Sequence, residues 1–305
     1  MIYIKQLKSG LNLYKALSSE IRLDIIELLC EHKSLNMNEI AKKLNLTNGA
    51  VTMHIKKLEE SGIIQIVSTV AKHGIQKICY LVDDKIMIDF TKQTKEDIYE
   101  VEIKVGHYKD YLVTPTCGLA TKDKIIGEFD DPRHFANPCH VDSEILWLTT
   151  GYVEYWLPNY LKSYQKIDEL QLSLELGSEA PSHRNEWPSD IYFYLNNTEV
   201  GYWTSPGDFG GEKEKRNPNW WPPHLNQYGV LKLLRINLEG SFIDGRKISN
   251  ITINDININS GSPIKLKIAV PTAAVNPNGL TIYGESFGRH PQNIIARVLY
   301  SNVPN

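Results

Sequence analysis

Residues 47–64, TNGAVTMHIKKLEESGII, carry the clearest pattern in this chain of 305 amino acids. Val51, Ile55 and Leu58 have the i, i+4, i+7 spacing that places side chains on one buried face of a helix. Short polar and basic side chains occupy much of the remaining stretch. Gly62 follows the last periodic residue, at a position where helices commonly end with a positive φ. The stretch therefore predicts an amphipathic helix that stops at Gly62 and continues into an extended segment.

The neighbouring segments predict the rest of a small domain. Residues 16–32 (ALSSEIRLDIIELLCEH) and 37–46 (MNEIAKKLNL) have the periodicity of a long and a short helix. Residues 63–70 and 76–82 alternate as two strands around a basic, glycine-containing turn. This order of elements predicts a winged helix-turn-helix: two helices, a tight turn, a third helix and a β-hairpin.

Residues 14–82 resemble the ArsR-like winged-helix family of bacterial transcription regulators. The matching residues are Ala16-Leu17-Ser18 to Leu28-Leu29, Ile40-Ala41, and residues 51–64 with His54 and Glu60-Ser61-Gly62. Metal-sensing members of that family carry paired cysteines on the helix before the turn, whereas residues 35–44 contain none. We therefore expect no metal site, and we expect the single Cys30 to pack as a small apolar side chain in the core.

The polar face of the third helix is the expected DNA-binding surface. We expect a homodimer that presents two such helices to successive major grooves of double-stranded operator DNA. The residues expected at base edges are Asn48, Thr52 and His54. Those expected at phosphates or at the minor groove beside the wing are Thr47, Lys56, Lys57, Lys72 and His73. The protein is then a transcriptional regulator, in the simplest case a repressor, although the sequence leaves open whether an effector releases or recruits DNA.

Length and composition indicate a cytoplasmic protein of two parts, with a net charge of −3. We expect a DNA-binding domain at residues 1–84, a linker at 85–99 and an effector-binding domain at 100–305. The linker is expected to form a helix or to stabilise a dimer. Four widely spaced cysteines do not make a disulfide framework. The start lacks the apolar segment of a signal peptide, so we expect no membrane contact. We also expect no cofactor.

The C-terminal two-thirds of the chain consists of short alternating runs cut by Gly, Pro, Asn and Asp. Such runs predict an antiparallel β-sandwich, and the absence of long helical patterns excludes a Rossmann or barrel scaffold. The expected fold class is therefore multidomain α+β. It combines a mainly α winged helix-turn-helix, which has a β-wing, with an all-β, jelly-roll-like sandwich.

An aromatic segment within this sandwich is the second informative feature. Residues 201–229, GYWTSPGDFGGEKEKRNPNWWPPHLNQYG, are expected to form a long loop between two strands. Long irregular loops in compact domains are commonly functional, and planar rings beside polar groups suit a sugar ring. The same aromatic side chains could instead seal the end of the sandwich or form a dimer interface. Of the tandem Trp220 and Trp221, we expect one ring to pack inward and the other to face a cavity.

This domain is loosely similar to the β-sandwich of bacterial regulators in which an ArsR-like head is fused to a fold like that of carbohydrate-binding modules. The residues that carry the similarity are Ser189-Asp190-Ile191 with Leu195-Asn196-Asn197, residues 203–210, and Asn217-Pro218 before Trp220-Trp221-Pro222. The similarity implies a small-molecule effector, a sugar or an oligosaccharide. The expected ligand-binding residues are Trp203, Asp208, Arg216, Trp220, Trp221, His224, Gln227, Arg133 and Glu285.

Three other interpretations remain open. Cys117, His134, Cys139 and His140 suggest zinc, but their spacing is not that of a zinc knuckle. The sandwich could recruit a protein partner instead of a small molecule. It could also be a carbohydrate-active enzyme, in which case paired carboxylates such as Asp208 and Glu285 would be needed.

Overall fold

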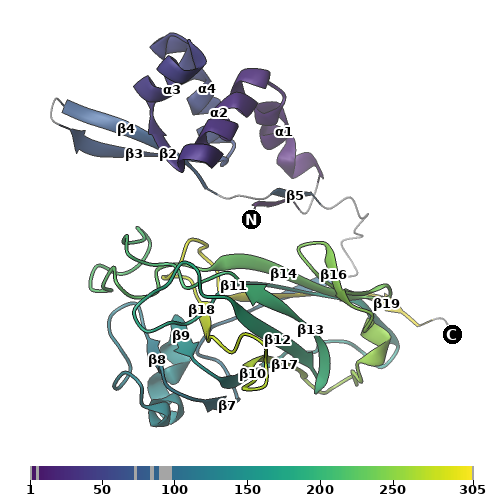
Figure 1. The fold of residues 1–305 in the computed structure, drawn as a ribbon. Coiled ribbons are helices and arrows are strands. Elements are labelled where there is room, and N and C mark those ends of the chain that lie inside the picture. The colour runs from purple at the N-terminus through teal and green to yellow at the C-terminus, as the bar shows by residue number, and fades with distance from the viewer. Residues whose placement is uncertain (1, 5–6, 72–73, 83–85, 89–97, 304–305) are drawn as a thin grey trace. The chain divides into compact units, whose positions relative to one another are not determined.

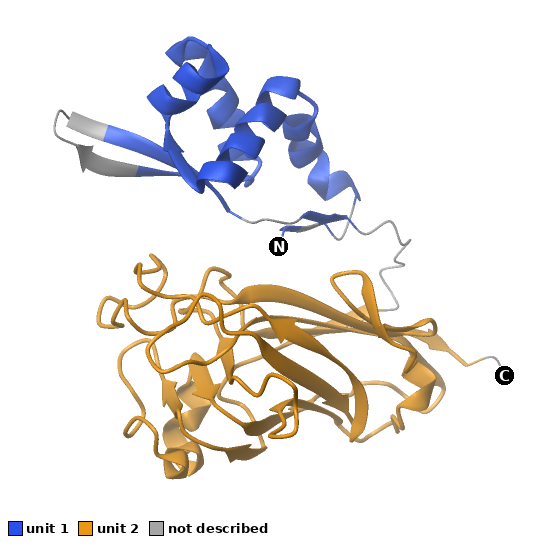
Figure 2. Ribbon diagram, viewed as in Figure 1, with its two compact units in different colours: residues 1–92 blue, residues 93–305 orange. Residues whose placement is uncertain are grey.

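The computed structural model describes residues 2–4, 7–71, 74–82, 86–88 and 98–303. The chain divides into two units, residues 1–92 and 93–305 (Figures 1 and 2). In the part that the structure describes, no helix is both long and apolar enough to cross a membrane.

The first unit is built from helices and a small antiparallel sheet (Figure 1). Its helical elements are η1 (Leu7–Gly10), α1 (Leu11–Leu17), α2 (Glu20–His32), α3 (Met37–Leu44) and α4 (Asn48–Glu60). Strands β2 (Ser34–Asn36), β4 (Gly74–Leu81) and β3 (Ile64–Ala71) form a sheet in the order β2-β4-β3. The predicted helices and hairpin are confirmed, and the pair β3 and β4 forms the wing.

Apolar periodicity explains how these helices pack. Val51, Ile55 and Leu58 of α4 have no exposed surface and share one core with residues of α2 and α3. Fully burying a side chain of this size stabilises the fold by about 1.5–3 kcal/mol. The expected burial of Cys30 is wrong. Its side chain is exposed because it follows the buried Leu29 on α2 and so points away from that helix's core face.

Local signals set the helix boundaries. Asn36 and Glu39 form a reciprocal capping box at the start of α3. Thr47 caps α4 by accepting a hydrogen bond from the Ala50 N–H at 3.3 Å. Gly62, just beyond α4, has a φ of 76°, which confirms the predicted helix stop.

The predicted linker differs from expectation where the structure describes it. Residues 86–88 form a strand, β5 (Ile86–Ile88), which pairs in parallel with β1 (Ile2–Ile4). The helix expected for the linker is therefore wrong at these residues. Residues 85 and 89–97 of the predicted linker lie outside the described part of the chain.

The second unit is a sandwich of two antiparallel sheets (Figure 1). The smaller sheet has the order β13 (Thr198–Ser205), β12 (Ser189–Leu195), β17 (Ile264–Val270), β10 (Gly151–Leu157) and β7 (Asp110–Val113). The larger has the order β16 (Arg246–Ser249), β15 (Gly240–Ile243), β14 (Val230–Asn237), β11 (Gln165–Gly177), β18 (Leu280–Tyr283), β9 (Ile145–Leu148) and β8 (Cys117–Ala120). Strand β19 (Ile294–Asn302) pairs with β11 and with β6 (Ile98–Ile103). Short 3-10 helices complete it: η2 (Pro132–Ala136), η3 (Pro138–Asp142) and η4 (Ile253–Asp255).

Strand alternation builds the core between the two sheets. In β12, Ile191, Phe193 and Leu195 are buried, whereas the intervening Tyr192 and Tyr194 are half-buried. Buried residues of β9, β11, β14 and β17 belong to the same core. The predicted all-β sandwich is confirmed.

Several strands of the larger sheet bury their outer face as well. Leu146 and Leu148 of β9 belong to the main core, whereas Trp147 between them belongs to a separate cluster with Tyr283 of β18. Trp221, from the connection between β13 and β14, completes that cluster. The connection at residues 206–229 therefore covers part of the outer face of this sheet, and the candidate site lies there.

Candidate functional site

Helix α4 presents most of the predicted DNA-binding residues on its surface. Thr47, Asn48, Thr52, Lys56 and Lys57 are exposed. The Thr52 hydroxyl donates to the Asn48 carbonyl at 2.8 Å, which ties it to the helix backbone. Lys56 lies 3.8 Å from Glu60 in an exposed i,i+4 pair that contributes little stability. These side chains are placed where a nucleic acid could reach them.

His54 was expected on the same exposed face, and the structure corrects this. Its side chain is only 8% exposed, because position 54 lies three residues after Val51 and four before Leu58, on the buried side of the helix. Burial lowers the pKa of His54, and the nearby charges of Arg22 and Lys57 lower it further. We therefore assign His54 to the interior of the unit. The other predicted contacts, Lys72 and His73, lie outside the described residues.

Two further residues of α4 lie beside Thr52 and Lys56 and were missed. Met53 is 51% exposed. Gly49 is exposed, and a Cβ atom added there would meet nothing within 4 Å. Gly49, Thr52, Met53 and Lys56 have the spacing of one helical face. The fold gives no packing reason for glycine at this position, and a close approach of another backbone would give one.

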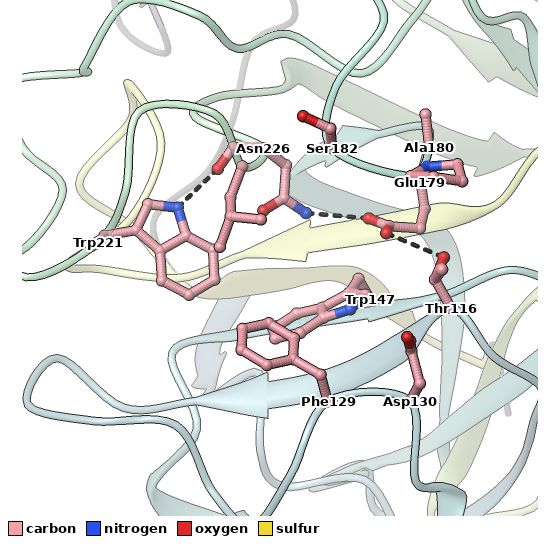
Figure 3. Close-up of a pocket in the computed structure, with 11 residues that line it drawn as sticks. Thr116, Phe129, Asp130, Trp147, Glu179, Ala180, Ser182, Trp221 and Asn226 are labelled. Carbon is pink, nitrogen blue, oxygen red and sulfur yellow. Dashed lines mark hydrogen bonds between the residues drawn. The ribbon is translucent and has the colours of Figure 1, made fainter.

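The second unit contains a cavity of about 260 Å³ on the outer face of the larger sheet. Its lining combines aromatic and aliphatic residues with hydroxyl, amide and carboxyl groups (Figure 3). The lining residues are Thr116, Phe129, Asp130, Trp147, Glu179, Ala180, Pro181, Ser182, Trp221, Leu225 and Asn226. Apolar walls with a few converging polar groups are the usual form of a small-ligand site.

Three aromatic rings form the apolar walls. The rings of Trp147 and Trp221 meet edge to face, with centroids 5.8 Å apart, and Phe129 lies 5.7 Å from Trp147. Trp221 is held by its indole N–H, which donates to the Asn226 carbonyl at 2.8 Å. Phe129 is 50% exposed and therefore stands at the edge of the cavity, whereas Trp147 and Trp221 are buried.

Gly118 on the adjacent strand β8 makes room for Trp147. A Cβ atom at Gly118 would lie 2.2 Å from the Trp147 ring, so Gly118→Ala must displace that ring. We expect this substitution to destabilise the second unit by about 1–3 kcal/mol and to change its tryptophan fluorescence. Urea unfolding followed by fluorescence measures both effects. Gly245→Ala is not a suitable control because Gly245 has a φ of 80°. Ser301→Ala, at the far end of β19, is the control, and we expect it to lower the free energy of unfolding by less than Gly118→Ala does.

Glu179 is the central polar group of the cavity. Its carboxylate accepts hydrogen bonds from the Thr116 hydroxyl and from the Asn226 amide, both at 3.1 Å (Figure 3). The side chain is 7% exposed. Burial raises the pKa of Glu179 well above its usual value, and the neighbouring Asp208 and Asp130 carboxyl groups add to this effect. Asp130 itself is exposed at the edge of the cavity.

Asp208 lies next to Glu179 but does not line the cavity. One of its oxygens accepts from the Ala180 N–H at 3.1 Å, and the other has no hydrogen-bond partner. Its side chain has no exposed surface, and burial raises the pKa of Asp208 to about 8. The buried hydroxyl of Tyr283 also lacks a partner, and its pKa is raised by burial and by this acidic cluster.

The predicted ligand residues are only partly brought together. Trp221 lines the cavity, and Trp220 packs edge-on against it at 5.5 Å while donating to the Lys122 carbonyl. Gln227 is fully buried. Its side-chain amide donates to the Pro222 and Leu225 carbonyls and so stabilises the connection at residues 206–229.

The remaining predicted ligand residues lie outside the cavity lining. Trp203 was expected in a loop, but it lies in strand β13 and packs against the main core. Arg133 is exposed and pairs with Asp131 at 2.6 Å. Arg216, His224 and Glu285 are exposed, and none of them is among the residues that line the cavity.

The zinc alternative receives no support from the geometry. Cys117 is buried in the sandwich, whereas Cys139 is exposed. The His140 Nδ1–H donates to the Gly106 carbonyl at 2.7 Å, and the His140 ring stacks on Tyr108. Among the residues that the structure describes, no three His, Cys, Asp or Glu side chains are grouped to hold a metal ion.

The match to a known family lies in the first unit. Residues 18–65 match a family described as winged helix-turn-helix DNA-binding. An uncharacterized protein of Methanocaldococcus jannaschii is 34% identical over 87 residues, which are 28% of this chain and 89% of that protein. An uncharacterized HTH-type transcriptional regulator of Pyrococcus furiosus is 51% identical over 41 residues, which are 13% of this chain but only 28% of that regulator.

One solved structure aligns over a larger part of the chain. A carbohydrate-binding module, CBM36, in complex with calcium and xylotriose is 10% identical and aligns over 67% of this chain and 99% of its own length. The TM-score of this alignment is 0.27.

Proposed function

Through its N-terminal unit the chain belongs to the winged helix-turn-helix DNA-binding family, and we propose that it is a transcriptional regulator whose β-sandwich senses a small carbohydrate. The DNA-binding residues proposed are the exposed members of α4: Thr47, Asn48, Gly49, Thr52, Met53, Lys56 and Lys57. Two copies of α4 in a homodimer would meet successive major grooves. Membership of the ArsR-like branch is part of this proposal.

The cavity is the observation that supports the sensing role. Its aromatic walls can stack against the C–H face of a sugar, and Glu179 and Asp130 can accept hydrogen bonds from hydroxyl groups. A flat apolar face would instead favour a protein partner. The hollow, polar shape of this site therefore favours a small ligand over the interaction module that the sequence left open.

The carboxyl pair that the sequence suggested for an enzyme does not meet at this cavity. Glycoside hydrolysis needs two carboxyl groups on opposite sides of the bond that is cleaved. Asp208 is fully buried, Glu285 is exposed, and neither lines the cavity. The pair suggested from the sequence is therefore not assembled around this site.

Phe129→Ala tests the sensing role without disturbing the core, because half of the Phe129 side chain is exposed. We expect a sugar that binds the wild-type protein to raise its melting temperature with the logarithm of sugar concentration. Phe129→Ala should weaken that sugar by about tenfold, since a stacking wall is lost. A thermal-shift screen of mono- and oligosaccharides, followed by calorimetry of each hit, measures this change.

Tyr164→Ala is the matched control, because Tyr164 is also 50% exposed and does not line the cavity. It should leave sugar affinity unchanged. Unchanged affinity in both variants would place the sugar elsewhere on the sandwich. The absence of any shift, in a protein that still binds DNA, would instead support a protein partner.

A further inference from the structure

The balance of donors and acceptors in the cavity is one-sided. The Asn226 amide N–H groups are already engaged by Glu179 and Thr281, at 3.1 Å each. The Trp221 indole N–H donates to the Asn226 carbonyl, and the Ser182 hydroxyl donates to the His224 carbonyl at 2.9 Å. The side-chain donors of Asn226, Trp221 and Ser182 are therefore engaged within the protein, whereas the carboxyl groups of the lining offer acceptors.

The titratable side chains in and beside the cavity are all acidic. Glu179 and Asp130 line it, and the buried Asp208 lies next to Glu179. No lysine, arginine or histidine occurs among the described residues that line it. Aromatic faces beside carboxyl groups, without a basic side chain, attract cations through the rings and through charge-assisted hydrogen bonds.

We propose that this cavity selects a ligand that carries an ammonium group, namely an amino sugar in preference to its neutral parent. The inference rests on the proposed carbohydrate-sensing function and specifies the class of sugar. The ammonium group lies between the aromatic walls and donates to Glu179, while Asp130 at the edge of the cavity adds a second negative charge.

Binding of such a ligand should release a proton from Glu179. Burial is the largest influence on the pKa of Glu179, and the charged groups that raise it further are Asp208, from the connection after β13, and Asp130, from the loop after β8. Hydrogen bonds from the Thr116 and Thr281 hydroxyls act in the opposite direction. Tyr283 of β18 and Cys117 of β8 are raised in pKa partly by Glu179 itself. Burial and these neighbours favour a protonated Glu179. An arriving ammonium group favours the carboxylate, so Glu179 passes its proton to the buffer and forms the ion pair.

The test compares charged and neutral probes on the full-length protein by isothermal titration calorimetry at pH 7. The sugar pairs are glucose and glucosamine, galactose and galactosamine, and mannose and mannosamine, with each N-acetyl derivative as a neutral control. Cyclohexylamine and cyclohexanol form a pair without sugar hydroxyls. We expect at least one amino sugar to bind about tenfold more tightly than its neutral parent. Its binding heat should differ between phosphate and Tris buffers, because protons are released.

Two variants assign the preference to the carboxyl groups. Glu179→Gln should abolish both the preference and the proton release. Asp130→Asn, at an exposed residue, should reduce the preference about threefold even if Glu179→Gln proves unstable. Equal affinity within every sugar pair would overturn the charge preference and leave sugar sensing intact. Binding of cyclohexylamine but of no sugar would overturn carbohydrate sensing and leave the preference for an ammonium group intact. The absence of binding by every probe would overturn both proposals.

Discussion

At pH 8.5, Asp208→Asn is expected to raise the melting temperature of the second unit by about 5–10 °C. Asp208 is fully buried, one of its oxygens has no partner, and burial raises its pKa to about 8. Ionising such a group costs a few kcal/mol. For a domain of this size, 1 kcal/mol corresponds to about 2–4 °C. Asparagine keeps the acceptor for the Ala180 N–H and never acquires the charge.

The pH dependence follows from the direction of this shift. The pKa of Asp208 is about 8 in the folded state against 3.8 for an ordinary aspartate, so between these values the folded state holds the proton more tightly. Stability is therefore lost as pH rises from about 4 to 8. Glu179 and Glu175 contribute in the same direction, since burial raises both pKa values, that of Glu175 to about 7. Asp208→Asn should thus reduce the pH dependence without removing it.

Tryptophan fluorescence isolates this effect, because all six tryptophans of the chain lie beyond residue 93. At pH 5 the melting temperatures of Asp208→Asn and the wild-type protein should differ much less than at pH 8.5, since most of the pH-dependent loss lies between pH 5 and pH 8. Asp190→Asn is the matched control. Asp190 is also buried, but it accepts hydrogen bonds from Thr204 and Asn276, so its substitution should destabilise the unit at both pH values. Lower stability of Asp208→Asn at pH 8.5 would show that Asp208 is needed as a carboxylate.

The first unit could be predicted from its sequence because its signals are local. Three apolar residues of α4 at helical spacing, the Thr47 cap and the Gly62 stop lie within one short stretch. Polarity alone predicts His54 on the exposed face, which is wrong because its side chain is buried. Its position between Val51 and Leu58 already places it on the buried face, and the same geometry would have identified Gly49 and Met53 as exposed.

The cavity could not be derived in the same way, because its walls come from distant segments. Thr116, Trp147 and Glu179 lie near the ends of three different strands, and only the sheet order brings them together. Trp147 alternates with core leucines, a pattern that also fits a strand with one exposed face. The sequence identified the tandem tryptophans, but the outer face that Trp221 covers depends on tertiary contacts.

Lys56→Glu is expected to weaken DNA binding about 100-fold for a homodimer. Lys56 is exposed on the same face of α4 as Thr52 and Gly49, so it is available to a phosphate. Replacing it by glutamate removes one phosphate contact, with the counterion release that accompanies it, and introduces repulsion of the phosphate. We take the resulting loss of affinity as about tenfold for each recognition helix. Fluorescence anisotropy with a labelled duplex, enriched from a random library by the full-length protein, measures the dissociation constant over a series of salt concentrations.

Salt dependence separates a phosphate contact from a folding defect. The slope of log affinity against log salt should decrease by about one for each helix that contacts DNA, hence by about two for a dimer. Lys8→Glu carries the same charge change in η1, outside α3 and α4, and should leave the affinity nearly unchanged. A tenfold loss with a slope change of one would indicate a single recognition helix on the DNA. An unchanged slope for Lys56→Glu would place the DNA on another surface of the unit, because no phosphate contact would then have been lost.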